Sequence, residues 1–374
     1  MNILFVVHEY PPLGGGGAQG VAALISGLAR RHQIAVLTSG NPAPDSSGDG
    51  PVVFRTGTTR GGHAGLTARD WAAFTIRAAM KGPEIVRAHG IQLVNSHFAV
   101  PGGVAGWRIA QRCRLPHIVS AIGADIHDPS RWLSPTRNFP LRMIVSRILR
   151  AADGVTVLSH DMANRVERLV PGSTPTVLPY PINPPPALPP RPTPPPWRLL
   201  TVCRLVRRKQ IEVLLAAVAR LEQAPVRLDI VGEGPSAPAL QNMAVELGIA
   251  DRVRFHGYVP LSQRWALAAQ AHMFLMVSAH EAQGLAYLEA MAAGLPVIAG
   301  ATGGQRDFVE HGREGFITSA APEEIAGQLS IIFDQPHIWQ TMSALAQRRA
   351  QEYQPETISR KWEAVFEGIM ETRT

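Results

Sequence analysis

Residues 278–304 read SAHEAQGLAYLEAMAAGLPVIAGATGG and contain two carboxylates, Glu281 and Glu289. The apolar run at 273–277 before them is short and partly β-branched, which predicts a buried strand ending in a loop that carries Glu281. Strong helix formers then extend from about Gly284 to a stop at Gly294 and Pro296. This pattern predicts a helix of about three turns that contains Glu289.

A strand, a loop and a helix in this order are typical of an open α/β sheet, in which ligands bind beyond the carboxyl ends of the strands. The unpaired N–H groups and the partial positive charge of a helix N-terminus favour a phosphate there. Carboxylates accept hydrogen bonds from sugar hydroxyls. The two glutamates beside such a helix start therefore predict a site for a nucleotide sugar.

The same alternation of apolar strands and helix-like segments extends over the whole chain. In the first half we expect strands at 3–7, 34–38, 52–55, 93–97, 117–121 and 155–158. In the second half we expect them at 199–202, 228–231, 253–255, 273–277 and 297–299. Near-continuous apolar strands alternating with helices predict parallel sheets covered on both faces, so the fold class is α/β, with two Rossmann-like domains facing across a cleft.

A proline-rich segment divides the 374 residues, which exceed the usual size of a single core. Between Pro179 and Pro196, 11 of 18 residues are proline, and this excludes a helix or a central strand. We therefore expect an N-terminal domain at 1–180, a semi-rigid linker at 181–196 and a second Rossmann-like domain at 197–355. A C-terminal helix at 356–374 could pack back on the first domain.

Cysteine usage and hydropathy favour a cytoplasmic protein. Cys113 and Cys203 lie in opposite halves without the spacing of metal ligands, which argues against a disulfide or zinc framework. The apolar N-terminus has no basic leader and predicts a first strand, not a signal peptide. No apolar segment approaches the ~20 residues needed to span a bilayer. We expect a cytoplasmic protein, or one associated with the cytoplasmic face of a membrane.

The net charge of +7 is concentrated in the first half of the chain. Residues 1–180 contain 18 Arg and Lys against 10 Asp and Glu, and the remainder contains 18 against 19. This asymmetry suggests an anionic partner, either a membrane surface or a phosphate-bearing acceptor, with solvated charge as the alternative. We do not expect nucleic acid, because no aromatic-interleaved basic ribbon or nucleic-acid motif is present. The basic amphipathic segment 137–150 could bind a membrane interface or simply cover the core.

Glycines and histidines follow the predicted strands of the first half. A glycine run between a strand and a helix, here including Gly15 and Gly16, lets backbone approach an anionic ligand, although a tight turn is the alternative. His97 ends a predicted strand, and Asp125 and His127 follow another. A lone histidine is more often structural, but a strand-end position favours ligand contact, so these three are acceptor-side candidates. No metal site is predicted, because no pair of residues shows ligand spacing.

Four cations follow the first strand of the second half: Arg204, Arg207, Arg208 and Lys209. Arginine can bind two phosphate oxygens at once and lysine acts as a point charge, so the cluster suits a diphosphate. A solvated charge cluster is the alternative. Gly232 closes the next predicted strand, and Gly303 with Gly304 closes another, so glycine recurs at strand ends that would line one cleft.

Taken together, these motifs resemble family 4 of the retaining glycosyltransferases, which have the two-domain B-type fold (GT-B). The most specific element is Glu-x7-Glu, here Glu281 to Glu289, within the longer match EAMAAGLPV at 289–297. Further matches are Arg204-Leu205 with Lys209, VGEG at 231–234, FHG at 255–257 and Gly303-Gly304.

The resemblance implies a hexosyltransferase that uses a nucleoside diphosphate sugar as donor and needs no cofactor or metal. It implies that Arg204 and Lys209 hold the diphosphate, that Glu289 binds the ribose and that Glu281 faces the donor sugar. The expected donor-binding residues are Gly15, Gly16, Arg204, Lys209, Gly232, Glu281, Gly284, Leu285, Ala286 and Glu289. The expected catalytic residues are Glu281, Arg204, Lys209 and His97. The acceptor would be a glycan or a lipid-linked sugar in cell-surface polysaccharide or glycolipid biosynthesis.

The sequence departs from the family pattern at Ile122, at Gln210 and at Val277, which replaces a common proline, and the first departure keeps a catalytically degenerate protein open. Ile122 stands where a histidine commonly touches the donor sugar, and an isoleucine cannot hydrogen-bond. Gln210 replaces a glycine that often follows the lysine. The alternatives are a sugar-nucleotide epimerase or hydrolase of the same fold, or a catalytically degenerate protein that only binds nucleotide sugars.

Overall fold

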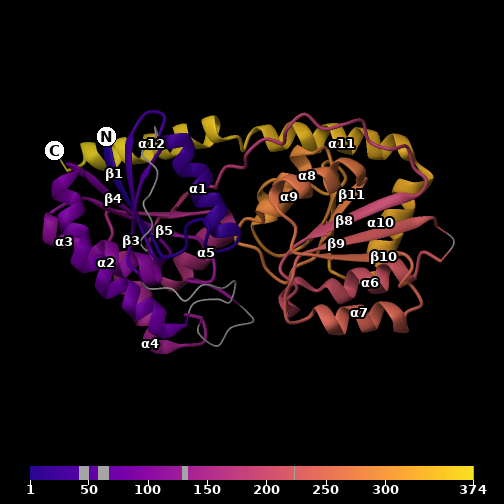
Figure 1. The fold of residues 1–374 in the computed structure, drawn as a ribbon, viewed down its shortest axis with the longest axis horizontal. Helices are drawn as coiled ribbons and strands as arrows, with labels where there is room; N and C mark the ends of the chain where they lie inside the picture. Colours follow the sequence, from indigo (N-terminus) through magenta and orange to yellow (C-terminus); the bar gives the residue numbers. More distant parts are fainter. Residues whose placement is uncertain (42–49, 58–66, 129–133, 223, 374) are drawn as a thin grey trace. The chain divides into compact units, whose positions relative to one another are not determined.

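The computed structural model describes residues 1–41, 50–57, 67–128, 134–222 and 224–373, which form two compact units (Figure 1). Unit 1 comprises Met1–Ile182 together with Pro355–Thr374, and unit 2 comprises Asn183–Gln354. Each unit is built around one sheet whose strands are all parallel, which confirms the predicted α/β class with two parallel-sheet domains.

The sheet of unit 1 has seven strands in the order β3-β2-β1-β4-β5-β6-β7. Its strands are β1 (Asn2–Val7), β2 (Gln33–Thr38), β3 (Val52–Arg55), β4 (Leu93–His97), β5 (His117–Ala121), β6 (Gly154–Val157) and β7 (Thr176–Val177). The sequence pattern missed β7, which has only two residues. The strand order changes direction between β1 and β4, and such a switch point is where open α/β sheets form a crevice.

Helices on both faces cover this sheet. They are α1 (Gly16–Leu28), α2 (Ala68–Ala88), the short η1 (Ala99–Gly103), α3 (Val104–Cys113), α4 (Phe139–Arg150), α5 (His160–Leu169) and the C-terminal α12 (Pro355–Glu371). Helix α2 begins with a capping box, in which Thr67 and Asp70 each bond the other's backbone N–H. Helix α12, yellow in Figure 1, packs against α1 of the same unit.

The sheet of unit 2 has six strands in the order β10-β9-β8-β11-β12-β13, with its switch point between β8 and β11. The strands are β8 (Trp197–Val202), β9 (Val226–Val231), β10 (Val253–Gly257), β11 (Met273–Met276), β12 (Val297–Gly300) and β13 (Gly315–Thr318). The helices are η2 (Arg207–Lys209), α6 (Ile211–Ala219), α7 (Ala237–Glu246), α8 (Leu261–Gln270), α9 (Leu285–Ala292), η3 (Gly304–Asp307), α10 (Pro322–Asp334) and α11 (Pro336–Gln351).

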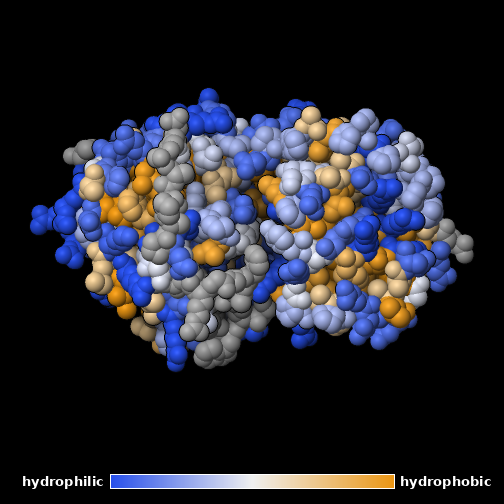
Figure 2. All heavy atoms as spheres, viewed as in Figure 1, coloured by the Kyte–Doolittle hydropathy of each residue, from blue (hydrophilic) through white to orange (hydrophobic). Residues whose placement is uncertain are grey.

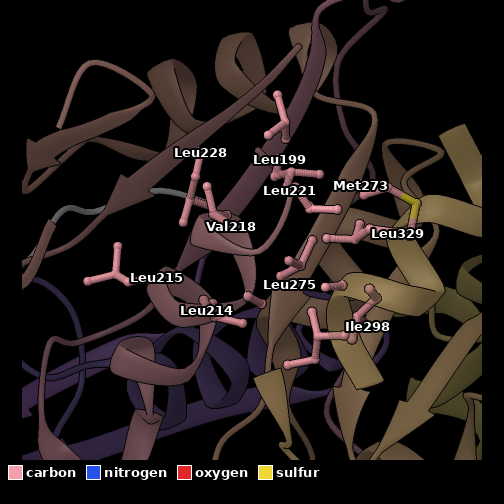
Figure 3. Packing of buried hydrophobic residues seen from close by; sticks show 14 of the residues in the cluster. Leu199, Leu214, Leu215, Val218, Leu221, Leu228, Met273, Leu275, Ile298 and Leu329 are labelled. Atoms are coloured by element: carbon pink, nitrogen blue, oxygen red, sulfur yellow. The ribbon is translucent and has the colours of Figure 1, made fainter. Parts of the chain in front are cut away.

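The core of unit 2 explains why strands β11 and β12 are apolar along their whole length. Leu214 and Leu215 of α6 and Leu329 of α10 are fully buried with Leu275 and Ile298, which come from the central strands (Figure 3). Every residue of β11 and of β12 is buried. Since parallel sheets are covered on both faces, the strands need apolar side chains in both directions.

Helix α9 is shorter than the sequence predicts. It has 8 residues, or about two turns, between Gly284 at φ +92° and Gly294 at φ +74°. Both glycines adopt the left-handed conformation that ordinary residues avoid. The strong helix formers at 285–293 therefore lie in or next to the helix, and the two glycines flank it.

The proline-rich segment belongs to unit 2 from Asn183 onward. The Arg191 guanidinium donates hydrogen bonds to the carbonyls of Ala293, at 2.7 Å, and Gly294, at 3.0 Å. The His272 Nε2 atom lies 2.8 Å from the carbonyl oxygen of Pro192. The second half of this segment is thus fixed on unit 2 by side-chain contacts.

Hydrophilic side chains predominate on the face shown in Figure 2, with smaller apolar patches between them. Helix α4 buries Val145, Ile148 and Leu149, yet it also exposes Phe139 (71%) and Met143 (59%). It therefore covers the core and at the same time presents apolar side chains to solvent. Among the described helices, none combines the length and the apolar character required to cross a membrane.

Candidate functional site

The loops after β8 and β11 meet at the switch point of unit 2. Arg204 and Lys209 follow β8, and Glu281 follows β11. The Lys209 ammonium forms a hydrogen-bonded ion pair with the Glu281 carboxylate. The sequence motif and the strand order thus bring the two residues together at the position where α/β sheets bind ligands.

The Lys209–Glu281 pair is largely shielded from water. Lys209 is 8% exposed, and its ammonium also lies 3.8 Å from the Met276 sulfur. Burial by itself raises the pKa of Glu281, but the positive charges of Lys209 and Arg208 outweigh this effect and hold the pKa below its usual value. Glu281 is therefore a carboxylate at neutral pH.

Close backbone packing fixes the position of Glu281. The Gly304 N–H donates to the Glu281 carbonyl at 2.8 Å. Gly303 has φ +121°, and a Cβ there would lie 2.5 Å from the Glu281 carbonyl oxygen. Gly303 is therefore needed for the approach of the β12 loop to the Glu281 backbone.

Gly232 has a comparable steric reason. It has φ +130°, and a Cβ would lie 1.9 Å from the Cys203 carbonyl oxygen. The loops after β8 and β9 are also joined by a hydrogen bond from the Leu205 N–H to the Glu233 carbonyl, at 2.8 Å. The absence of a side chain at 232 thus serves loop packing next to Arg204. Donor contact by Gly232 remains a prediction.

Arg204 itself is an exposed guanidinium at the carboxyl end of β8. No described residue forms an ion pair or hydrogen bond with its side chain. Arg208 is more tightly held, because its Nη1 atom lies 3.4 Å from the His280 carbonyl oxygen. The sequence shows Arg208 only as one of four cations, because its influence on Glu281 depends on the folding of η2 against the β11 loop.

Helix α9 begins beside this ion pair. No side chain caps its N-terminus, and a Cβ on Gly284 would lie 2.6 Å from the Tyr287 ring. Leu285 and Ala286 form the first turn and are half-buried. The backbone N–H groups of a first helical turn have no partner within the helix and favour an anion.

Glu289 lies one turn further along α9. Its side chain is 28% exposed, and its nearest charged neighbour is Arg264, whose Nη1 atom is 3.8 Å from Oε2. No hydrogen bond reaches this carboxylate from the described residues. Burial raises the pKa of Glu289, and the positive charge of Arg264 acts against that shift. No local sequence pattern indicates Arg264, because its approach to Glu289 depends on how α8 and α9 fold.

In unit 1, Gly15 and Gly16 lie where β1 passes into α1. A Cβ on either would meet no described atom within 4 Å, so the described chain gives no steric reason for a glycine at these two positions. Among the residues that the structure describes, no side chain caps α1. The backbone there is open to a ligand, as expected of a phosphate-binding loop.

His97 contradicts its predicted role. Its exposed fraction is 0%, its ring stacks on Phe5 and Trp362, and its Nδ1 atom lies 2.5 Å from the Tyr180 hydroxyl. Burial lowers the pKa of His97 to about 3. His97 is a neutral residue of the aromatic core, so the prediction that it acts in catalysis and contacts the acceptor is wrong in this structure.

Asp125 connects two strand-end loops. Its carboxylate accepts hydrogen bonds from the N–H groups of Ala99, at 2.7 Å, and Gly123, at 2.8 Å. Burial raises the pKa of Asp125 to about 6, and the backbone hydrogen bonds act against this shift. His127 is half-buried, and its backbone N–H donates to the Gly123 carbonyl at 2.9 Å. Acceptor contact by Asp125 or His127 stays a prediction.

Ile122 is 6% exposed and directly follows the last residue of β5. Gln210 adopts φ +52°, in the left-handed region, which is a physical reason why a glycine suits this position. Within the described ranges, no three His, Cys, Asp or Glu side chains come together in a group that could hold a metal ion.

Two family models match this chain, one in each half. Residues 15–181 match the model of the glycosyl transferase 4-like domain, and residues 191–351 match that of glycosyl transferases group 1. A GDP-mannose-dependent mannosyltransferase of Mycolicibacterium smegmatis, acting on phosphatidylinositol monomannoside, is 29% identical over 84% of this chain and 84% of its own.

Two solved structures show the same fold over nearly the whole chain. Sucrose-phosphate synthase from Thermosynechococcus elongatus matches with a TM-score of 0.83 and 22% identity, covering 99% of both chains. A protein from Anabaena, solved in complex with UDP-glucose, matches with a TM-score of 0.74 and 20% identity over 98% of this chain and 100% of its own. The two family models, the relative and the folds agree with the predicted family and fold. The chain belongs to family 4 of the glycosyltransferases and is a hexosyltransferase of the GT-B fold.

Proposed function

We propose that the protein transfers a hexose from a nucleoside diphosphate sugar to a glycan or lipid-linked acceptor, with retention of anomeric configuration. The observation that carries this proposal is the shielded Lys209–Glu281 ion pair beside the start of α9. Arg204 adds an exposed cation from the loop after β8, which also leads to Lys209. Together they offer positive charge for a diphosphate and a carboxylate for sugar hydroxyls.

In the proposed reaction, the bond between the anomeric carbon and the donor phosphate oxygen breaks, and the electron pair stays on that oxygen. Arg204 and Lys209 stabilise the negative charge that develops there, as fixed cations in a site shielded from water do. No metal is required for this role in the proposal. Glu281 remains ionised beside Lys209 and accepts hydrogen bonds from the donor sugar.

Retention follows if the acceptor attacks from the face that the diphosphate leaves. The acceptor oxygen bonds to the anomeric carbon, and its proton passes to the departing phosphate oxygen. A double displacement would instead need a carboxylate placed to form a covalent intermediate. Glu281 is engaged by Lys209, which favours a hydrogen-bonding role for it over a nucleophilic one.

The donor's ribose is assigned to Glu289. Its carboxylate accepts no hydrogen bond from the described residues, so it is available to the two hydroxyls of a ribose. The first turn of α9 lies between Glu281 and Glu289 and would receive phosphate oxygens at Leu285 and Ala286. The open backbone at Gly15 and Gly16 is proposed as a further donor contact.

We assign the acceptor to unit 1, on the cytoplasmic face of a membrane. Helix α4 exposes Phe139, Met143 and Ile144 next to Arg142 and Arg147. Apolar side chains among arginines suit an interface with anionic lipid, and hence a lipid-linked acceptor of polysaccharide or glycolipid synthesis. Cosedimentation with vesicles of anionic lipid, compared with zwitterionic ones, separates membrane contact from solvated charge.

Donor turnover with defined variants tests the proposal. Arg204→Ala removes an exposed guanidinium without a described partner, so it should leave the fold intact and lower kcat about 100-fold. Lys209→Ala should lower it at least as much, with its melting temperature measured alongside because Glu281 is left unpaired. Arg227→Ala, an exposed arginine on β9, is the matched control.

Unaltered turnover in both Arg204→Ala and Lys209→Ala would contradict the assignment. Donor consumption at the same rate without any acceptor would indicate a hydrolase or epimerase instead. Nucleotide binding without turnover, whatever acceptor is supplied, would indicate a degenerate site.

A further inference from the structure

Arg264 is a cation whose hydrogen-bonding capacity unit 2 does not use. It lies in the first turn of α8, and its side chain is 26% exposed. Within the described chain, its side-chain interaction is the 3.8 Å approach to Glu289, which is longer than a hydrogen bond. Its Nε atom is buried and has no hydrogen-bond partner in the described chain.

A buried donor without an acceptor costs free energy, so its retention calls for an explanation. Neutralising Glu289 would require only a nearby positive charge. A guanidinium aimed with its Nε–H toward no protein acceptor is instead suited to a ligand that brings acceptors of its own.

The order of groups along α9 indicates which part of the ligand this is. On the proposed function, the phosphates lie at the first turn of α9 and the ribose lies at Glu289, about 6 Å further along the helix axis. A nucleotide carries its base on the ribose carbon opposite the phosphate-bearing end. On this order, a side chain that approaches Glu289 lies beside the ribose, where it can meet the base that the ribose carries.

We infer that Arg264 reads the edge of the donor's base and selects bases that present a carbonyl oxygen over bases that present an amino group. The inference rests on the proposed nucleotide-sugar site. A guanidinium has five N–H donors and no acceptor, so it pairs with acceptors alone. Guanine offers O6 and N7 to such a fork, whereas adenine opposes it with an N6 amino group. Uracil and cytosine differ in the same way at position 4.

Two pairs of nucleotides exchange this carbonyl for an amino group, and in each pair the adjacent ring nitrogen changes from N–H donor to acceptor as well. Inosine diphosphate and ADP differ at position 6 of the purine, and UDP and CDP differ at position 4 of the pyrimidine. Calorimetric titration of the full chain should give Kd values for inosine diphosphate or UDP, whichever ring size the site accepts, about tenfold lower than for the amino counterpart.

Arg264→Gln should reduce that ratio to near one, because an amide can either donate or accept. Arg264→Lys keeps the charge beside Glu289 but lacks the fork, and should retain only part of the ratio. Arg254→Gln, an exposed arginine on β10, is the matched control and should retain all of it.

The possible failures are distinguishable. If no nucleoside diphosphate binds the unmodified protein, the proposed function fails. If nucleotides bind but both pairs show equal affinity, the inference about Arg264 is overturned without any variant. It is also overturned if Arg264→Gln weakens all four nucleotides equally, since the guanidinium would then serve the phosphates, or if selectivity survives in that variant.

Discussion

At the scale of single residues, buried histidines make the stability of unit 1 depend on pH. His8 is 4% exposed, and its ring packs 4.6 Å from that of Phe98. Burial lowers the pKa of His8 to about 3, and the same holds for His97 and His117. In the unfolded chain a histidine has a pKa of about 6.5. Between these values the unfolded state binds more protons, so stability is complete above pH ~6.5 and is lost as the pH falls.

We predict that His8→Phe reduces the loss of stability of unit 1 as the pH falls. Removing one such histidine should lower the slope of unfolding free energy against pH by about 1.4 kcal/mol per unit between pH 6 and 4. Hydrogen exchange of the β1 and β4 amides measures that free energy in unit 1. Glu9, 3.8 Å from the His8 ring, remains unchanged in the variant. Parallel slopes for the two proteins would show that His8 does not titrate on unfolding.

Asp125 changes the pH dependence of the stability of unit 1 in the opposite direction. Its pKa of about 6 lies above that of an unfolded aspartate, so its contribution is complete at low pH and is lost as the pH rises through 6. One such carboxyl offsets one histidine over the shared range. Because three buried histidines lose stability in acid and one carboxyl offsets only one of them, we expect unit 1 to be less stable at acid pH.

At the scale of elements, Arg191 holds the C-terminal end of the helix that carries Glu289. Its guanidinium bonds the carbonyls of Ala293 and Gly294, and the Ser343 hydroxyl bonds Gly294 as well, at 2.6 Å. Burial lowers the pKa of Arg191 to about 10, so the side chain stays charged at neutral pH. The carbonyls at a helix end have no partner within the helix and attract a cation.

We predict that Arg191→Ala destabilises unit 2 by about 3 kcal/mol, since it leaves two carbonyls without charged donors. Urea unfolding of unit 2, followed at the amides of β11 and β12, measures this change. The variant should unfold at a lower urea concentration. Arg198→Ala removes an exposed hydrogen bond to Gln270 and should change the free energy of unfolding by less than about 0.5 kcal/mol. Equal effects of the two substitutions would contradict the assigned role of Arg191.

The sequence predicted elements better than contacts. The strands were predictable because both faces of a parallel sheet are buried, and only the short β7 and β13 were missed. Lys209 and Glu281 were found because a strand-end motif fixes both. Arg264 and Arg191 act on α9 from elsewhere in the chain, and no local pattern records such packing. His97 was mistaken for a site residue because a strand end does not reveal that aromatic rings cover it.

At the scale of the whole molecule, the chain passes from unit 1 to unit 2 and returns. Helix α12 completes unit 1 through ion pairs of Arg31 with Glu356, at 2.7 Å, and with Glu363, at 2.8 Å. Trp362 of α12 is fully buried, stacks on His97 and donates a hydrogen bond to the Pro179 carbonyl at 3.2 Å. The last helix of the chain is thus part of the core of its first domain.

Gly27 of α1 packs closely against α12. A Cβ there would lie 2.3 Å from the Ser359 hydroxyl and 3.3 Å from the Pro355 carbonyl oxygen. We predict that Gly27→Val forces the helices apart and costs unit 1 about 1–3 kcal/mol. Hydrogen exchange should then quicken in α1 and α12 together, while the sheet of unit 2 is unaffected.

Gly368→Val is the matched control, because a Cβ at Gly368 of α12 would meet no described atom within 4 Å. It should leave exchange in both helices unchanged. If Gly27→Val quickened exchange in α1 alone, α12 would be held independently of that contact. Faster exchange in both helices would instead show that residues at opposite ends of the chain unfold as one cooperative unit.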